Sequence, residues 1–105
     1  MSFQVIWSNF AEKQLDEIFD YYSTNASLRI AQELLISLIH STELIADNPY
    51  IGQVEELLKE RSEQYRYLVQ GNYKIIYSVD REQVSIKIAD IFDTRQNPVK
   101  MKRNV

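Results

Sequence analysis

Apolar and polar residues alternate between Tyr65 and Asp93, and this pattern leaves few possible folds for the second half of the chain. Apolar side chains recur at every second position in three successive runs, which are separated by Gly71-Asn72 and by the polar segment 80–83. A period of two is typical of a β-strand with one buried face. Because glycine accepts the positive φ of a tight turn, Gly71-Asn72 predicts a two-residue hairpin. The stretch therefore predicts a three-stranded antiparallel meander with one apolar face.

The preceding half of the chain predicts one short strand and two helices. Residues 3–7 alternate, and Ser8 or Asn9 can cap a helix with the apolar stripe Ala11, Leu15, Ile18, Phe19 and Tyr22. Ser27 can cap a second helix that ends at Asn48-Pro49, because proline disfavours helical geometry in the residue before it. A short polar linker between the helices predicts an antiparallel hairpin. The fold class is α+β.

The second helix is apolar around more than one face. Its main stripe is widened by Ile30, Ile36, Ile39 and Leu44. Contact with the first helix on one side and with the sheet on the other explains this width. The alternative is that Ile36 or Leu44 belongs to a docking groove for another chain.

The polar side of the meander is expected to carry a cation on each strand. Counting by parity places Arg66 and Leu68, Lys74 and Ile76, and Lys87 on one face. This face is either an ordinary solvated surface or a contact surface for a polyanion or an acidic partner. After Ile88 the alternation of apolar and polar residues shifts by one position, and a bulge near Ala89 would explain this shift.

Length and charge indicate one globular domain with two kinds of surface. The chain has 105 residues, no cysteine and a net charge of −3. Residues 1–64 carry 4 Lys/Arg and 11 Asp/Glu, whereas residues 65–105 carry 8 and 4 and end in a basic tail from about residue 99. The acidic total argues against tight unspecific binding of nucleic acid. We expect no secretory signal, no membrane span and a cytoplasmic location.

The sequence offers little conventional catalytic chemistry. Its one histidine, His40, has no companion for metal-ligand spacing, and two glycines are too few for a phosphate-binding loop. We therefore expect no metal and no cofactor. If the chain cleaves RNA, the groups available are Arg66, Lys74, Arg95 and Asp93, because a cation can stabilise the charge of the transition state.

Several motifs in chain order resemble toxins of the RelE/ParE superfamily. They are Val5-Ile6-Trp7-Ser8, then Asn48-Pro49 with Gly52, then Tyr65-Arg66-Tyr67-Leu68-Val69, Gly71-Asn72-Tyr73-Lys74-Ile75-Ile76-Tyr77, and Ile91-Phe92-Asp93-Thr94-Arg95-Gln96-Asn97-Pro98. The resemblance implies a helical hairpin packed on one face of a four-stranded, mostly antiparallel sheet. It also implies a type II toxin that a cognate antitoxin neutralises by folding onto it, in a hetero-oligomeric complex.

The superfamily holds two activities, and the resemblance leaves both open. ParE-like members inhibit DNA gyrase, whereas RelE-like members cleave messenger RNA on the ribosome. The acidic charge and the lack of a histidine near the C-terminus favour the ParE-like activity; a non-toxic module that only binds a partner is a third possibility. The expected target contacts are Arg66, Lys74, Lys87 and Arg95, and the expected antitoxin contacts are Ile36, Leu44, Leu68 and Ile76.

Overall fold

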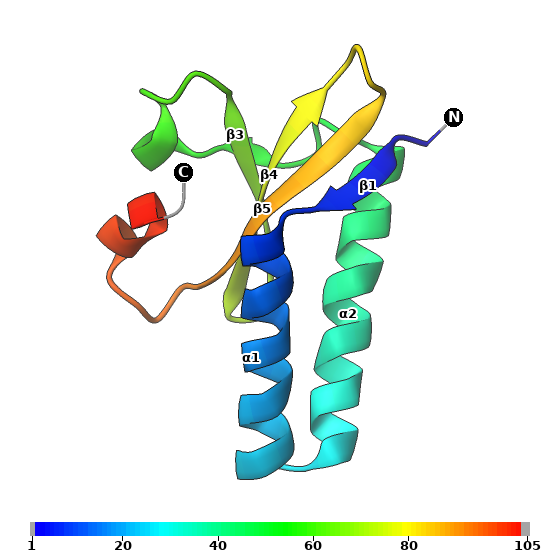
Figure 1. The fold of residues 1–105 in the computed structure, drawn as a ribbon, viewed down its shortest axis with the longest axis vertical. Coiled ribbons are helices and arrows are strands. Elements are labelled where there is room, and N and C mark those ends of the chain that lie inside the picture. Colours follow the sequence, from blue (N-terminus) through cyan, green and yellow to red (C-terminus); the bar gives the residue numbers. More distant parts are fainter. Residues whose placement is uncertain (1, 104–105) are drawn as a thin grey trace.

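A computed structural model describes residues 2–103 as a helical hairpin packed on a mixed five-stranded sheet. The chain begins with β1 (Gln4–Trp7) and continues into α1 (Asn9–Asn25) and α2 (Leu28–Asp47), which lie side by side (Figure 1). The order in the sheet is β1-β5-β4-β3-β2. Strand β1 runs parallel to β5, and the other neighbouring pairs are antiparallel. The predicted α+β class, helical hairpin and meander are confirmed.

Local sequence signals set both helix starts. The Ser8 hydroxyl accepts the N–H of Ala11 at 3.0 Å, and the Ser27 hydroxyl accepts the N–H of Ile30 at 3.1 Å. The predicted end of the second helix is also confirmed, because α2 ends at Asp47, directly before Asn48-Pro49.

The meander consists of β3 (Tyr65–Gln70), β4 (Tyr73–Asp80) and β5 (Ser85–Asp93). Gly71 has φ +59° in the predicted hairpin turn. The predicted bulge is also present, because the β4–β5 register shifts between Ile76, which pairs with Asp90, and Tyr77, which pairs with Ile88. The third alternating run follows the polar segment 80–83, so the sequence pattern predicts a strand that begins at Val84. This is wrong for Val84, which has φ +50° and ends the loop before β5.

A fifth strand corrects the expectation of a four-stranded sheet. Strand β2 (Gln53–Val54) pairs antiparallel with Tyr67 and Arg66 of β3. Two residues are too few to show a period of two, so the sequence pattern gave no sign of this strand. The short 3₁₀ helix η1 (Glu56–Leu58) follows it.

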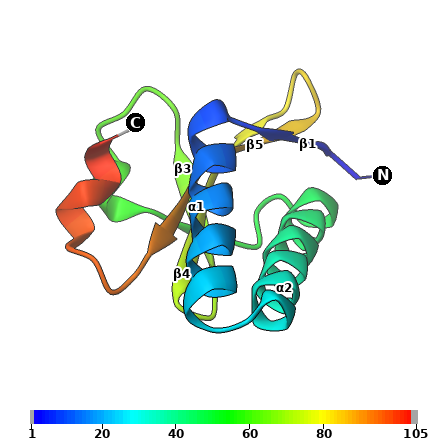
Figure 2. The ribbon, with the colours of Figure 1, turned by 60° about the horizontal axis from the view of Figure 1, so that its bottom comes forward.

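Apolar residues fill both faces of the sheet. The helices cover a first core, which contains Ala11, Leu38, Ile45, Tyr73, Ile75, Tyr77, Ile86, Ile88 and Ile91. The opposite face holds a second core of Leu58, Ile76, Ala89, Phe92 and Met101, to which η1 and the C-terminal 3₁₀ helix η2 (Pro98–Arg103) contribute. Figure 2 shows these two short helices on one side of the sheet and α2 on the other. The basic tail is therefore packed on the domain as far as Arg103.

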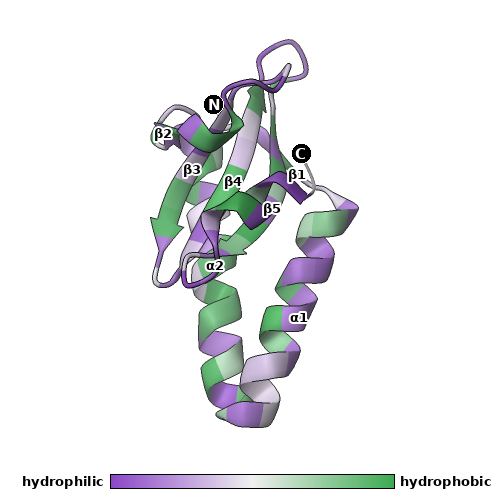
Figure 3. Cartoon of the chain, turned by 90° about the vertical axis from the view of Figure 1, so that its left-hand side faces the viewer, coloured by the Kyte–Doolittle hydropathy of each residue, from purple (hydrophilic) through white to green (hydrophobic). Residues whose placement is uncertain are grey.

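The hairpin of α1 and α2 extends beyond the edge of the sheet (Figure 3). Apolar segments recur along α2 in this view, and several of its large apolar side chains stay exposed. Neither long helix combines the length and the apolar content that a membrane-crossing segment needs, and the same holds for the other helices among residues 2–103.

Candidate functional site

The four expected target contacts do not form one surface. Arg66 lies opposite Tyr77 in the β3–β4 ladder and so belongs to the helix side of the sheet. Lys74 pairs with Phe92, and Lys87 pairs with Ser78, on the opposite side. The expectation of a shared cationic face is therefore wrong. Directly opposed residues share a face, and the two-residue turn places odd-numbered residues of β3 opposite even-numbered residues of β4.

Arg66 is held by the loop that precedes β2. Its Nη1 donates to the carbonyl oxygen of Gly52 at 2.9 Å, and its guanidinium carbon lies 4.9 Å from the centre of the Tyr50 ring. A cavity of about 180 Å³, also lined by Arg81, adjoins this side chain. These contacts assign Arg66 a part in fixing the loop.

Lys74 is engaged in a largely buried ion pair. Its Nζ lies 3.0 Å from Oε2 of Glu55, whose side chain is only 5% exposed. The same ammonium lies 4.1 Å from the centre of the Tyr67 ring. Lys74 is therefore bound by groups of its own domain.

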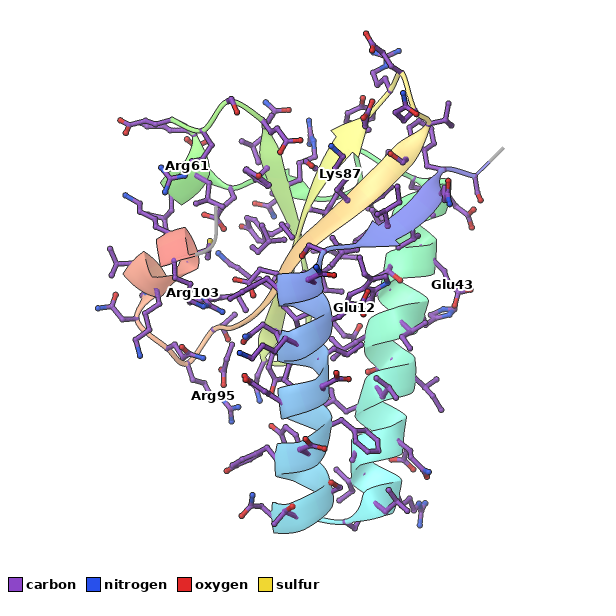
Figure 4. All side chains as sticks on the ribbon, in the orientation of Figure 1. Glu12, Glu43, Arg61, Lys87, Arg95 and Arg103 are labelled. Atoms are coloured by element: carbon purple, nitrogen blue, oxygen red, sulfur yellow. The ribbon has the colours of Figure 1, made fainter. Side chains whose placement is uncertain are left out.

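Lys87 and Arg95 keep about half of their side chains exposed, 48% and 55% respectively. Figure 4 shows them at opposite ends of the sheet. Lys87 makes long ion pairs to Glu63 at 3.7 Å and to Asp80 at 4.0 Å. Because these two cations lie at opposite ends of the sheet, a single ligand group cannot bind both.

At the end of the sheet that carries Arg95, this residue and Asp93 form a two-pronged ion pair beside two tyrosines. Arg95 donates from Nε to Asp93 Oδ1 and from Nη2 to Asp93 Oδ2, both at 2.9 Å. Its Nη2 also donates to the hydroxyl of Tyr22 at 3.4 Å, and the Tyr73 hydroxyl donates to the same oxygen at 3.5 Å. We call Tyr22, Tyr73, Asp93 and Arg95 the Arg95 cluster.

Three elements position the Arg95 cluster. Tyr73 begins β4 directly opposite Asp93 at the end of β5, and Tyr22 comes from the last turns of α1. Arg95 follows in the turn after β5, which its own N–H stabilises by donating to Asp93 Oδ1 at 2.9 Å. The cluster borders a cavity of about 370 Å³ that Gln14, Glu17, Ile18, Tyr21, Ile91 and Gln96 also line.

The electrostatics of the Arg95 cluster favour fixed charges over proton transfer. The hydrogen bond with Arg95 lowers the pKa of Asp93, and the same contact raises the pKa of Arg95. Burial raises the pKa of Tyr73, whereas the hydrogen bond from Tyr73 is the main cause that lowers the pKa of Tyr22. The cluster thus offers a permanent cation and phenolic hydroxyls for binding.

Among residues 2–103, no group of three or more His, Cys, Asp or Glu side chains could hold a metal ion. His40 is exposed on α2, away from the Arg95 cluster in the chain. The Arg95 cluster is suited to recognising a polar or anionic surface.

The four expected antitoxin contacts differ in how far they are exposed to solvent. Ile36 and Leu44 of α2 are 66% and 42% exposed, so both are accessible to a partner. Leu68 is half-buried and packs against the first core, opposite Ile75. Ile76 is 0% exposed in the second core, so the expectation that it contacts another chain is wrong for this folded state.

Sequence reasoning missed Tyr22 and Tyr73 as site residues. Tyr22 falls in the apolar stripe of the first helix, and Tyr73 falls in the apolar alternation of the second strand of the meander, so the sequence pattern predicts core positions for both. The signal that could have found them is the hairpin geometry, because a meander through residues 73–93 brings the first residue of β4 beside the last residue of β5.

Comparison with known proteins agrees with this architecture. Residues 5–98 match the family described as ParE toxin of type II toxin-antitoxin system, parDE. A solved structure of a chromosomal ParDE system from P. aeruginosa has a TM-score of 0.71 at 17% identity and covers 88% of this chain and 96% of that chain. The RelBE2 toxin-antitoxin complex from Mycobacterium tuberculosis has a TM-score of 0.62 at 13% identity, with 89% and 92% covered. No curated protein matches the chain.

Proposed function

Because this chain belongs to the ParE toxin family of type II toxin-antitoxin systems, we propose that it arrests growth by inhibiting DNA gyrase until a cognate antitoxin binds it. The observation that carries the proposal is the match to ParE toxins over residues 5–98. The location of the cations supports the proposal, because the arginines and lysines are not gathered at one place as a ribonuclease site would need. Arg66 and Lys74 bind groups of their own domain, and Lys87 and Arg95 lie at opposite ends of the sheet.

Within this proposal, the Arg95 cluster is the main target contact. Asp93 holds its guanidinium, and the Arg95 side chain is still 55% exposed, so the cation can meet an anionic group without first being ordered. Gyrase acts inside the cell, so the proposed site of action is the cytoplasm.

A ribosome-dependent ribonuclease is the second candidate. The observation that favours it is the presence of a cation and two phenols beside one open cavity. Against it, Arg95 is the only one of the three arginines and lysines expected for catalysis that reaches this cavity.

The deciding experiment measures gyrase and messenger RNA separately. Purified toxin is titrated into a supercoiling assay, and mRNA ends are mapped after induction in cells. We expect supercoiling to fall with toxin concentration, to recover on addition of antitoxin, and mRNA ends to stay unchanged. Unaffected gyrase at high toxin excess contradicts the proposal, and new mRNA ends during growth arrest support the ribonuclease.

A further inference from the structure

The C-terminal helix η2 (Pro98–Arg103), here called the strap, is attached to the rest of the domain by side chains alone. Its backbone hydrogen bonds stay local, as from the N–H of Lys100 to the carbonyl oxygen of Asn97 at 3.0 Å, and none reaches a strand or another helix among residues 2–103. Met101 is its buried residue, whereas Val99 is 59% exposed. A segment held in this way can open while the sheet stays folded.

Met101 fastens the middle of the strap. It is 1% exposed and packs in the second core with Leu58 of η1, Ile76 of β4 and Phe92 of β5. When the strap opens, this apolar part of the sheet meets water, which opposes opening. The closed strap is therefore the main state of the chain.

Arg103 fastens the end of the strap. Its Nη2 donates to Asp90 Oδ1 at 3.2 Å and to Oε1 of the neutral Gln14 on α1 at 3.5 Å. Its guanidinium carbon lies 5.0 Å from the centre of the Phe10 ring and 5.4 Å from that of the Phe92 ring (Figure 4). Attraction to the ring faces adds to the ion pair. One side chain thus joins the strap to both α1 and β5.

The carboxylate that receives Arg103 is buried while the strap is closed. Asp90 is 1% exposed, and its Oδ2 has no hydrogen-bond partner among residues 2–103. On β4 its direct partner is the apolar Ile76, and Lys74 on the same face is paired with Glu55. Arg103 is therefore the cation that faces this carboxylate. A single partner offsets only part of the cost of burying the charge.

Closure of the strap and protonation of Asp90 are linked, because opening gives this carboxylate access to water. Burial raises the pKa of Asp90 to about 6, against the opposing effect of Arg103. An exposed aspartate has a pKa of about 3.9, so the closed strap holds the proton more tightly than the open strap. Closure is therefore tightest below about pH 4 and weakens as the pH rises through about 6.

We propose that the strap opens locally and reversibly, that the contact of Arg103 with Asp90 sets how often it opens, and that opening becomes more frequent as the pH rises from about 5 to about 7.5. Opening uncovers Ile76 and Phe92, so the strap determines when this apolar face can be reached. The inference concerns the free chain and does not depend on the gyrase target.

A single thiol measures the opening, because the chain has no cysteine of its own. Met101→Cys places the thiol under the closed strap, whereas Val99→Cys places it at a position that is 59% exposed and reports the reactivity of a free thiol at each pH. The rates of reaction with a dipyridyl disulfide are measured for both variants. We expect the ratio of the Met101→Cys rate to the Val99→Cys rate to rise at least about threefold between about pH 5 and about pH 7.5.

Two substitutions in the Met101→Cys chain test the two partners of the contact. Asp90→Asn removes the titrating group, so the rise of the ratio with pH should disappear. Arg103→Met removes the opposing cation, so opening should increase at least about tenfold at about pH 7.5 and less at about pH 5, where most of the buried carboxyl is protonated. Lys102→Met is the matched control, since it removes the same charge from an exposed residue of the strap, and its ratio should stay within about twofold of the unsubstituted ratio.

Urea denaturation of each variant separates local opening from unfolding of the whole domain. If Met101→Cys reacts only as fast as global unfolding allows, the strap is not a separate unit and the inference is overturned. A rise with pH that persists in Asp90→Asn, or an Arg103→Met chain that behaves like Lys102→Met, overturns it as well. Relaxation dispersion of the Met101 methyl group in the wild-type chain measures the same opening without the thiol, and a loss of dispersion towards about pH 5 is the expected result.

Discussion

The hydroxyl of Tyr77 lies directly against Gly52. It accepts the N–H of Gly52 at 2.9 Å and donates to the carbonyl oxygen of Pro49 at 2.7 Å. A core strand thus holds the loop between α2 and β2, and Arg66 binds the carbonyl oxygen of the same glycine. Burial raises the pKa of Tyr77, so the hydroxyl stays protonated as a donor.

Gly52→Ala is expected to destabilise the protein strongly. A Cβ at this position would lie 2.6 Å from the Tyr77 hydroxyl and 2.7 Å from the carbonyl oxygen of Tyr67. Since backbone lines this space, we expect the free energy of unfolding to fall by about 3 kcal/mol, the upper end for overpacking. Urea denaturation measures the change.

The control for this substitution is Gly71→Ala. Gly71 has φ +59° and no atom within 4 Å of the added Cβ, so only backbone strain of about 1 kcal/mol is expected. Equal losses for the two variants would show that steric contact with Tyr77 is unimportant.

The pair of Lys74 and Glu55 should behave as a structural unit. Lys74→Met leaves Glu55, which is 4% exposed, without its cation. We expect a loss of about 3 kcal/mol, the lower end for a buried pair, because Lys74 keeps some contact with water. The double variant Lys74→Met, Glu55→Leu should recover much of this loss.

A double-mutant cycle by urea denaturation measures the coupling. If the losses in unfolding free energy from the two single substitutions were additive, Lys74 and Glu55 would not act as one structural unit. Retained gyrase inhibition by the double variant would further show that Lys74 is not needed at the target.

Asp90 should make the native state less stable as the pH rises. It is 1% exposed, and its Oδ1 accepts from Arg103 Nη2 at 3.2 Å. Burial raises the pKa of Asp90 to about 6, against the opposing effect of Arg103. Because the unfolded pKa is about 3.9, the native state holds the proton more tightly. The resulting stability is complete below about pH 4 and is lost as the pH rises through about 6.

Asp90→Asn tests this linkage. At about pH 7.5 the variant should be more stable than wild type, by at most about 3 kcal/mol for two pKa units, and the difference should vanish near pH 4. Asp93→Asn is the matched control with the opposite sign, since the hydrogen bond with Arg95 lowers the pKa of Asp93. A less stable Asp90→Asn protein at about pH 7.5 would disprove a net cost of the buried charge.

Arg95→Ala should weaken gyrase inhibition without unfolding the domain. The side chain is 55% exposed and contributes charge and hydrogen-bond donors. We expect the inhibitory concentration to rise more than about tenfold, as for anchoring arginines of other interfaces. Arg95→Lys should also inhibit gyrase more weakly than wild type, because lysine cannot reproduce the two-pronged contact with Asp93.

Arg29→Ala is the control for Arg95. It removes a cation that is 87% exposed at the start of α2, where its only described ion pair is with Glu33. Equal inhibition by wild-type and Arg95→Ala toxin would remove the Arg95 cluster from the target interface.

Local signals in the amino-acid sequence are sufficient to predict the helix ends and the hairpin turn. Ser8 and Ser27 cap helices, Asn48-Pro49 ends one, and Gly71 turns a hairpin, because each acts through backbone preferences or contacts a few residues away. The bulge near Ala89 was also predictable, since a slip in parity within one strand is a local signal.

The face of the sheet that each side chain occupies, and the residues that cover it, depend on long-range packing. The pairing of Arg66 with Tyr77 moved one cation to the helix side, and packing of Met101 from η2 buried the face that holds Ile76. The Arg95 cluster likewise joins Tyr22 of α1 to Tyr73 and Asp93 of the sheet. A period of two fixes sides within a strand, but the partner across the ladder and the cover above it depend on residues far away in the chain.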